Sequence, residues 1–153
     1  MRHLIATLAL SFAFVQGVAA QQSGPVFQAD KMELDFGEIP YKGEGTREFK
    51  FRNTGNSVLL VTNARGSCGC TVPEWPKEPI RPNETSSIRI KYDTSRSGPI
   101  LKTVTVTTNE VESTDAAGNP VYKQHTITVK GNVRPAPQND GLPTRTNSSI
   151  PQD

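Results

Sequence analysis

The sequence is 153 residues long and carries 17 Lys and Arg against 15 Asp and Glu, a formal net charge of +2 at pH 7. This near-neutral balance, without a run of basic residues, excludes the electrostatic surface that nucleic-acid binding requires, and it makes an acidic membrane surface a poor partner. The length suits one domain with a single modest core.

Residues 1–20 have the features of a secretory signal peptide. Arg2 and His3 provide a positive start, residues 4–15 are apolar, and Val18-Ala19-Ala20 forms a cleavage site of small residues. The apolar stretch is shorter than the roughly 20 residues that a membrane helix needs, and no later stretch approaches that length. We therefore expect an exported protein without a membrane span, located in the periplasm or outside the cell.

Short strands are predicted through the middle of the chain, where apolar and polar residues alternate between turn-forming Gly, Pro, Asn and Asp. The alternation is clearest over residues 32–36, 49–51, 88–92, 104–106 and 127–133. A continuous apolar run at residues 58–61 predicts a further strand in the centre of the structure. Residues 110–120 predict a longer polar loop before the last strand.

Six or seven short strands, with no convincing amphipathic helix, predict an all-β fold. We expect an immunoglobulin-like antiparallel β-sandwich of about seven strands over residues 21–133. Residues 134–153 are rich in Pro, Asn, Ser and Gln and predict a disordered tail. The two cysteines stand too close in sequence to form the inter-sheet disulfide of antibody domains.

Several short motifs recur in order along residues 27–133. They are Asp35-Phe36-Gly37-Glu38-Ile39, Phe49-Lys50-Phe51-Arg52-Asn53-Thr54-Gly55, Ser67-Cys68-Gly69-Cys70-Thr71, Pro79-Ile80, Tyr92-Asp93-Thr94, Thr108-Asn109 and Gly131-Asn132-Val133. In these motifs the chain resembles a bacterial family of exported proteins, domain of unknown function 1573, and the Ser-Cys-Gly-Cys-Thr string is the most specific of them. The resemblance implies an immunoglobulin-like fold. It implies no reaction, because a fold alone does not define one.

Cys68 and Cys70 are the only cysteines and the only chemically reactive feature of the sequence. In an extended strand their Cα atoms would lie about 6.6 Å apart, so a disulfide requires a bend, which Gly69 permits. A bond that closes so small a loop should add little stability and should be easier to reduce than a structural bridge. Three interpretations stay open: a local disulfide or idle thiols, redox exchange, and binding of a soft metal such as copper or zinc.

Additional metal ligands are scarce. After signal cleavage the chain has one histidine, His125, and one methionine, Met32. Both share strand parity with apolar residues, which favours a structural role facing the core for each. His125 is therefore only a conditional third ligand beside Cys68 and Cys70, and no cofactor motif is found.

Trp75 lies in a proline-framed loop just after the cysteines and is the candidate binding residue, either as an exposed anchor or as a lid over the end of the sandwich. Two carboxylate pairs, Glu33 with Asp35 and Glu110 with Glu112, have strand spacing but are expected on the solvated surface.

The sequence contains no phosphate-binding glycine loop, nucleophile elbow, zinc helix or calcium loop. It therefore predicts a non-catalytic interaction or structural module with a protein or cell-envelope partner. The alternative is a periplasmic protein for thiol redox or soft-metal handling that uses Cys68 and Cys70. In either case the loop end that carries the cysteines and Trp75 is the expected working surface.

Overall fold

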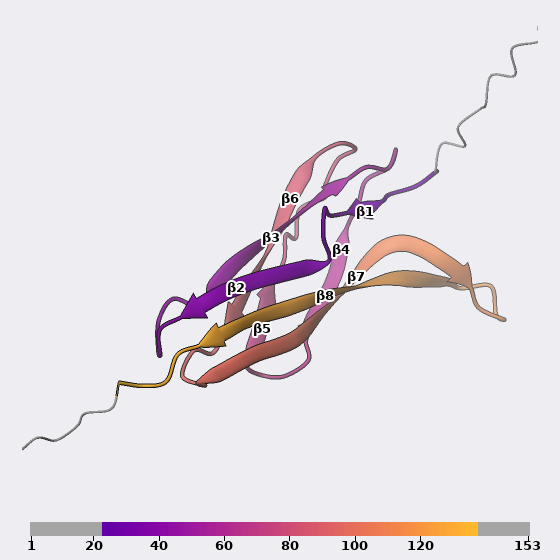
Figure 1. Cartoon of the computed structure of the whole chain (residues 1–153). Coiled ribbons are helices and arrows are strands. Elements are labelled where there is room, and N and C mark those ends of the chain that lie inside the picture. Colours follow the sequence, from indigo (N-terminus) through magenta and orange to yellow (C-terminus); the bar gives the residue numbers. More distant parts are fainter. Residues whose placement is uncertain (1–22, 138–153) are drawn as a thin grey trace, which may run out of the picture.

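The computed structural model of the chain describes residues 23–137. The expected signal peptide and residues 138–153 of the expected tail lie outside this range. The described residues form eight strands and no helix, and so contain nothing helical that could cross a membrane (Figure 1). The strands are β1 (Phe27–Gln28), β2 (Glu33–Ile39), β3 (Thr46–Asn53), β4 (Val61–Gly66), β5 (Thr71–Glu74), β6 (Thr85–Tyr92), β7 (Gly98–Thr114) and β8 (Pro120–Val133).

The strands build two four-stranded sheets. One has the order β1-β3-β6-β5 and the other β2-β8-β7-β4. All neighbours are antiparallel except β2 and β8, which run parallel and lie side by side in Figure 1. Among the strands of the second sheet, β2 comes first along the chain and β8 comes last. The predicted immunoglobulin-like sandwich is confirmed. The parallel pair was not predicted, because alternation along a strand does not record the direction of its neighbour.

The core follows the alternation of apolar residues along the strands. Side chains of one parity on each strand point between the sheets and are removed from water. The fully buried apolar side chains include Phe51, Leu59, Ile88, Ile90, Val104, Val106, Ile127, Val129 and Val133. Met32 is half-buried and packs against this cluster, in agreement with its expected structural role.

The run at residues 58–61 does not form a central strand, and that expectation is wrong. Only Val61 belongs to β4, which is an end strand of its sheet. Val58 and Leu60 are exposed, whereas Leu59 and Val61 are buried. Leu59 is held by an isolated pairing with Ile80 that stops after one residue. The four residues therefore alternate between exposed and buried side chains, because only one face of this extended segment meets the core.

Residues 110–120 are also not a long loop. β7 continues to Thr114, β8 begins at Pro120, and the tight turn between them is held by the Asp115 carboxylate, which accepts hydrogen bonds from Ala117 and Asn119. β4 pairs with β7 only as far as Thr108. Residues 111–122 therefore form a two-stranded arm, the β7–β8 arm, which extends beyond the rest of the sandwich (Figure 1).

Candidate functional site

The cysteines lie in the short connection between β4 and β5, two end strands that belong to different sheets. Cys68 and Cys70 form a disulfide, and their Cα atoms are 5.2 Å apart, closer than an extended chain would hold them. The connection bends at Gly69, where an added Cβ would meet nothing within 4 Å. The sequence spacing allows a disulfide only if the chain bends. The structure has this bend, and the disulfide forms.

Backbone hydrogen bonds hold this connection in place from both sheets. The Ser67 amide donates to the carbonyl of Thr103 in β7 (2.8 Å), and the Asp93 amide donates to the carbonyl of Cys70 (2.9 Å). Within the connection, the Thr71 amide donates to the Cys68 carbonyl (3.2 Å). The cysteine backbone is therefore positioned independently of the disulfide.

Gly66 allows the two chain segments to approach closely. A Cβ at this position would collide with the Thr71 carbonyl oxygen, so no other residue fits without a backbone shift. Gly66 ends β4 and Thr71 begins β5. The glycine thus brings the edges of the two sheets together at the disulfide.

A shallow groove of about 660 Å³ runs along this edge of the molecule, lined by residues 64–69, 71–73 and 75. We call it the cysteine groove. Cys68 is half-buried and lines the groove, whereas Cys70 does not line it and is buried in the core cluster at 7% exposure. The two sulfur atoms of one bond are thus unequally open to an approaching molecule.

Thr71 is the closest polar neighbour of the disulfide. Its hydroxyl oxygen lies 3.6 Å from the Cys68 sulfur and 3.8 Å from the Cys70 sulfur, and the residue is 2% exposed. The sequence motif contains Thr71 but gives no indication of this contact. Its side chain faces the sulfurs because β5 begins at this residue and turns it inward.

Trp75 lies just beyond the end of β5 and lines the groove. Its ring is half-buried and packs against the core, while the Lys77 ammonium lies 3.4 Å from the ring centroid. This contact covers one face of the indole with a cation. Trp75 thus combines the two expected roles, because it covers part of the core and also contributes an apolar wall to the cysteine groove.

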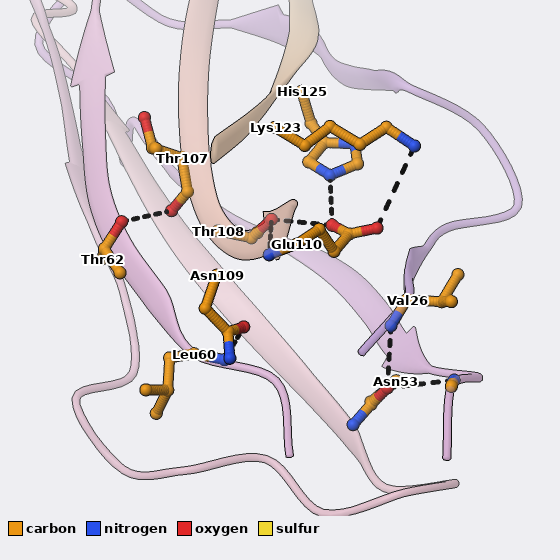
Figure 2. A network of polar contacts seen from close by, with 11 residues as sticks. Val26, Asn53, Leu60, Thr62, Thr107, Thr108, Asn109, Glu110, Lys123 and His125 are labelled. Atoms are coloured by element: carbon orange, nitrogen blue, oxygen red, sulfur yellow. Dashed lines mark hydrogen bonds and ion pairs between the residues drawn. The ribbon is translucent and has the colours of Figure 1, made fainter. Parts of the chain in front are cut away.

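A second polar cluster lies near the base of the β7–β8 arm (Figure 2). The Glu110 carboxylate is 2.6 Å from His125 Nε2, accepts a 2.7 Å hydrogen bond from the Thr108 hydroxyl, and lies 4.0 Å from the Lys123 ammonium. The His125 ring is 4.5 Å from the ring of Phe27 in β1. We call Thr108, Glu110, Lys123 and His125 the Glu110 network.

The expectation that Glu110 lies on the solvated surface is wrong, since the residue is only 5% exposed. Burial raises the pKa of its carboxyl, but hydrogen bonds from His125, Thr108 and the Phe27 backbone amide outweigh burial and place the pKa below the ordinary value. The carboxylate is therefore held in its charged form. Through Phe27 it also joins β1 of one sheet to β7 and β8 of the other.

The structure brings Cys68, Cys70 and Trp75 together but does not add His125 to them. His125 instead contacts Glu110 and Phe27, as a satisfied structural histidine would. Within residues 23–137, no three His, Cys, Asp or Glu side chains are grouped so that they could hold a metal ion. Glu33 and Asp35 are exposed beside Lys130, as expected for a solvated pair.

The order of the strands in the two sheets defines the class of the protein, an immunoglobulin-like β-sandwich domain with similarity in fold to PapD-like domains. The model of the family described as "Protein of unknown function (DUF1573)" matches residues 27–133. The chain belongs to this family, which confirms the resemblance seen in its motifs. No curated protein gives a significant match.

Solved structures share the fold at low sequence identity. A protein of unknown function from Porphyromonas gingivalis has a TM-score of 0.56 at 17% identity, over 76% of this chain and 50% of that one. The periplasmic chaperone SfaE gives 0.51 at 10%, over 74% and 59%. PapD-like domain 7 of human CEP192 gives 0.51 at 8%, over 90% and 100%. The chain thus spans half the length of the first and 59% of the second, and these similarities define the fold alone.

Proposed function

We propose that the protein is exported and acts in the periplasm or outside the cell as a non-catalytic interaction module. In this proposal the cysteine groove binds an extended polypeptide segment of a cell-envelope protein. The observation that carries the proposal is the groove itself, an open surface of about 660 Å³ with an aromatic wall at Trp75. Loops on a rigid sandwich are common sites of binding.

The edge position of β5 supports an extended partner. β5 is the end strand of its sheet and pairs only with β6. Gly66 of β4 approaches its outer edge at Thr71, and Pro73 has no N–H to donate, so a bound segment would donate main-chain hydrogen bonds to the remaining carbonyl oxygens of that edge. Val72 in this strand is 52% exposed and lines the groove. A bound strand would cover this apolar side chain and gain contact with Trp75.

The name of one structural relative is in line with this proposal. SfaE is described as a periplasmic chaperone, which is a protein that acts on other proteins. Its identity to this chain is 10%, so the likeness is an analogy at the level of the fold. The groove carries the proposal without it.

Site-specific photocrosslinking of the full chain in its native host tests where a partner binds. A crosslinker at Val72 should capture one reproducible protein, whereas a crosslinker at Leu101, 74% exposed on β7 and outside the groove, should not. Equal capture from both positions would contradict a specific site. The same preparation tests export. The N-terminal sequence of this chain, recovered from the host, should begin near Gln21 if the signal peptide is removed.

Affinity for the captured partner should then depend on Trp75. Trp75→Ala is expected to weaken binding by about 30-fold or more, the effect of removing an aromatic anchor that contributes about 2 kcal/mol. The matched control is Tyr122→Ala, because Tyr122 is a 46% exposed aromatic residue on the β7–β8 arm. If the two variants lose affinity equally, the groove is not the binding site.

The disulfide favours a second candidate function, thiol–disulfide exchange. The bond closes a loop with a sequence separation of only two, which contributes little to holding the domain together. A bond with so small a structural role, next to an open groove, is available for chemistry. Soft-metal handling by the reduced cysteines has no comparable support among the described residues.

A further inference from the structure

We infer that the disulfide exchanges with a protein dithiol, that Cys68 is the sulfur attacked, and that the Thr71 hydroxyl stabilises Cys70 as it leaves. This inference rests on the second candidate function, thiol–disulfide exchange. It adds to that function the order of events, the class of substrate and a catalytic role for a buried hydroxyl.

The unequal burial of the two sulfurs sets the point of attack. A thiolate must approach a disulfide sulfur along the line of the S–S bond, which requires open space at that sulfur. Cys68 lines the groove, whereas Cys70 is 7% exposed and belongs to the core cluster. Attack therefore takes place at Cys68, and Cys70 becomes the leaving group.

The Thr71 hydroxyl is placed to stabilise that leaving group. The hydrogen bonds of this hydroxyl in the structure go to the two disulfide sulfurs, at 3.6 and 3.8 Å. A disulfide sulfur is a weak acceptor, whereas a thiolate carries a full charge and accepts a much stronger hydrogen bond. A hydroxyl that is 2% exposed cannot turn to water instead, so reduction improves its bonding.

A substrate thiolate forms a bond to the Cys68 sulfur while the Cys68–Cys70 bond breaks, and the electron pair stays on Cys70, which then takes up a proton. The second thiolate of the substrate then attacks the first substrate sulfur, which is bonded to Cys68 in the mixed disulfide. Cys68 is released and takes up another proton. The substrate dithiol is oxidised by two electrons, and this chain's disulfide is reduced to two thiols.

The backbone around the cysteines allows the reverse reaction as well. The Cys68 carbonyl is bonded to the Thr71 amide and the Cys70 carbonyl to the Asp93 amide, so both residues keep their places when the bond opens. Two thiols held close together readily re-form their disulfide by exchange with a protein disulfide, which is reduced to a dithiol in the same reaction. The site thus works as a reversible pair in a fixed frame.

The groove indicates a protein substrate in preference to a small thiol. Its volume of about 660 Å³ exceeds what one cysteine side chain fills, and Val72, Pro73 and Trp75 give it apolar walls. A polypeptide with apolar residues beside its cysteines would bury these walls. Glutathione, which is small and highly polar, would leave them exposed to water.

Single-cysteine variants of the full chain test the point of attack. In Cys70→Ser the remaining Cys68 thiol should react with dithiodipyridine about tenfold faster or more than the Cys70 thiol does in Cys68→Ser, because burial limits access. The Cys68 thiolate of the same Cys70→Ser variant should attack a peptide disulfide, release one peptide thiol and form a mixed disulfide that is visible by mass spectrometry. Equal reaction rates in the two variants would overturn the assignment of Cys68.

Two Thr71 variants test the hydroxyl. Thr71→Val keeps the side-chain shape and removes the donor, and it should lower the rate constant for reduction by glutathione about tenfold, the factor for a hydrogen bond to a charged leaving group. Thr71→Ser keeps the donor and should stay near the wild-type value. A packing defect would instead affect both variants, and an unchanged constant in Thr71→Val would refute the role of the hydroxyl.

Substrate class is tested with a dithiol peptide whose cysteines are flanked by Val and Leu. It should reduce the wild-type disulfide about tenfold faster than dithiothreitol at equal concentration, and Trp75→Ala should remove this advantage without changing the dithiothreitol rate. Equal rates for the two reagents would contradict a protein substrate. If excess of either reagent leaves the wild-type disulfide intact, the exchange function itself fails, whereas a normal rate with no effect of Thr71→Val defeats only the inference.

Discussion

The cysteine groove and the Glu110 network lie at different positions of the same sandwich, and they differ in how far their polar or reactive groups are buried and connected to the rest of the fold. In the groove, the disulfide lies against open space and closes a minimal loop. In the network, the carboxylate is 5% exposed and its partners come from β1, β7 and β8. The reactive cysteines are therefore expected to contribute little to the stability of the fold, whereas Glu110 connects the two sheets.

The largest effect we expect is from removing the Glu110 carboxylate. Glu110→Ala leaves His125 and Thr108 without their shared buried acceptor, and it should lower the free energy of unfolding by about 3 kcal/mol. Urea unfolding measures the change. Glu112→Ala, two residues away and exposed, is the control and should stay within about 0.5 kcal/mol of the wild type. Similar losses for both variants would remove the contrast between network and surface.

Gly66→Ala should have the next largest effect, about 2 kcal/mol, because the new methyl group collides with the Thr71 carbonyl and forces the edges of the two sheets apart. Gly69→Ala is the matched control, since a methyl group there meets nothing within 4 Å. Urea unfolding of both variants compares their free energies of unfolding. It shows whether the connection between β4 and β5 tolerates a side chain at Gly69, between the cysteines, but not at Gly66, at the end of β4. A cost at Gly69 equal to that at Gly66 would disprove this picture.

Reduction of the disulfide should cost less, about 1.5 kcal/mol, because a bond that closes so short a loop constrains the unfolded chain weakly. Unfolding with and without dithiothreitol measures this cost, and the Cys68→Ser, Cys70→Ser double variant should be insensitive to the reagent. A loss as large as that in Glu110→Ala would mean that the bond is structural and would weaken the case for exchange.

The smallest effect is expected in acid. The pKa of Glu110 is lower in the folded protein than in the unfolded chain, so the unfolded chain takes up the proton more readily. The stability that Glu110 contributes is present above its ordinary pKa of 4.5 and is lost as the pH falls through the folded value. His125 and Lys123 are the charged or titratable groups that face the carboxylate.

Glu110→Gln removes this part of the acid dependence, and comparing its unfolding with that of the wild type from neutral pH to below 4.5 isolates it. Glu44, Asp93 and Asp115 also have lowered pKa values, but they are exposed and unchanged in both proteins, so their share cancels. Parallel stability curves for the two proteins would contradict the assigned direction.

Much of the sandwich could be predicted from the sequence because its strands alternate strictly. Ile88, Ile90 and Tyr92 are buried on one face of β6, as their parity required. The arm was missed because its residues 111–122 include exposed Val111, Val121 and Tyr122 among polar residues, and no core defines their parity. A hairpin that packs on nothing leaves little trace in the pattern of hydrophobicity.

Glu110 could have been placed from the same parity rule. Val104, Val106 and Thr108 precede it at intervals of two and are all fully buried, so the rule put its side chain inward. The charge of the residue indicates solvent instead, unless it is considered together with His125, its partner on the next strand. Two polar residues that both face inward on neighbouring strands were the signal for the network.

The cysteine site was only partly predictable. The motif and its glycine indicated where a bend and a bond could form, but the burial of Cys70 and the position of Thr71 depend on how β5 meets β6 and on the Asp93 amide, which comes from a distant segment. Which sulfur faces the groove is therefore a property of the packed sheets and not of the local sequence.

The parallel pairing of β2 with β8 has a consequence for biosynthesis. β2 is the second strand along the chain and β8 is the last. The sheet that contains both therefore cannot be completed until nearly the whole domain has been synthesised. A ribosome adds about 5–20 residues per second, so the emerging chain stays without its final strand order until β8 is available. A secretory system that requires an unfolded substrate would therefore meet a chain whose second sheet is still incomplete, for as long as synthesis continues.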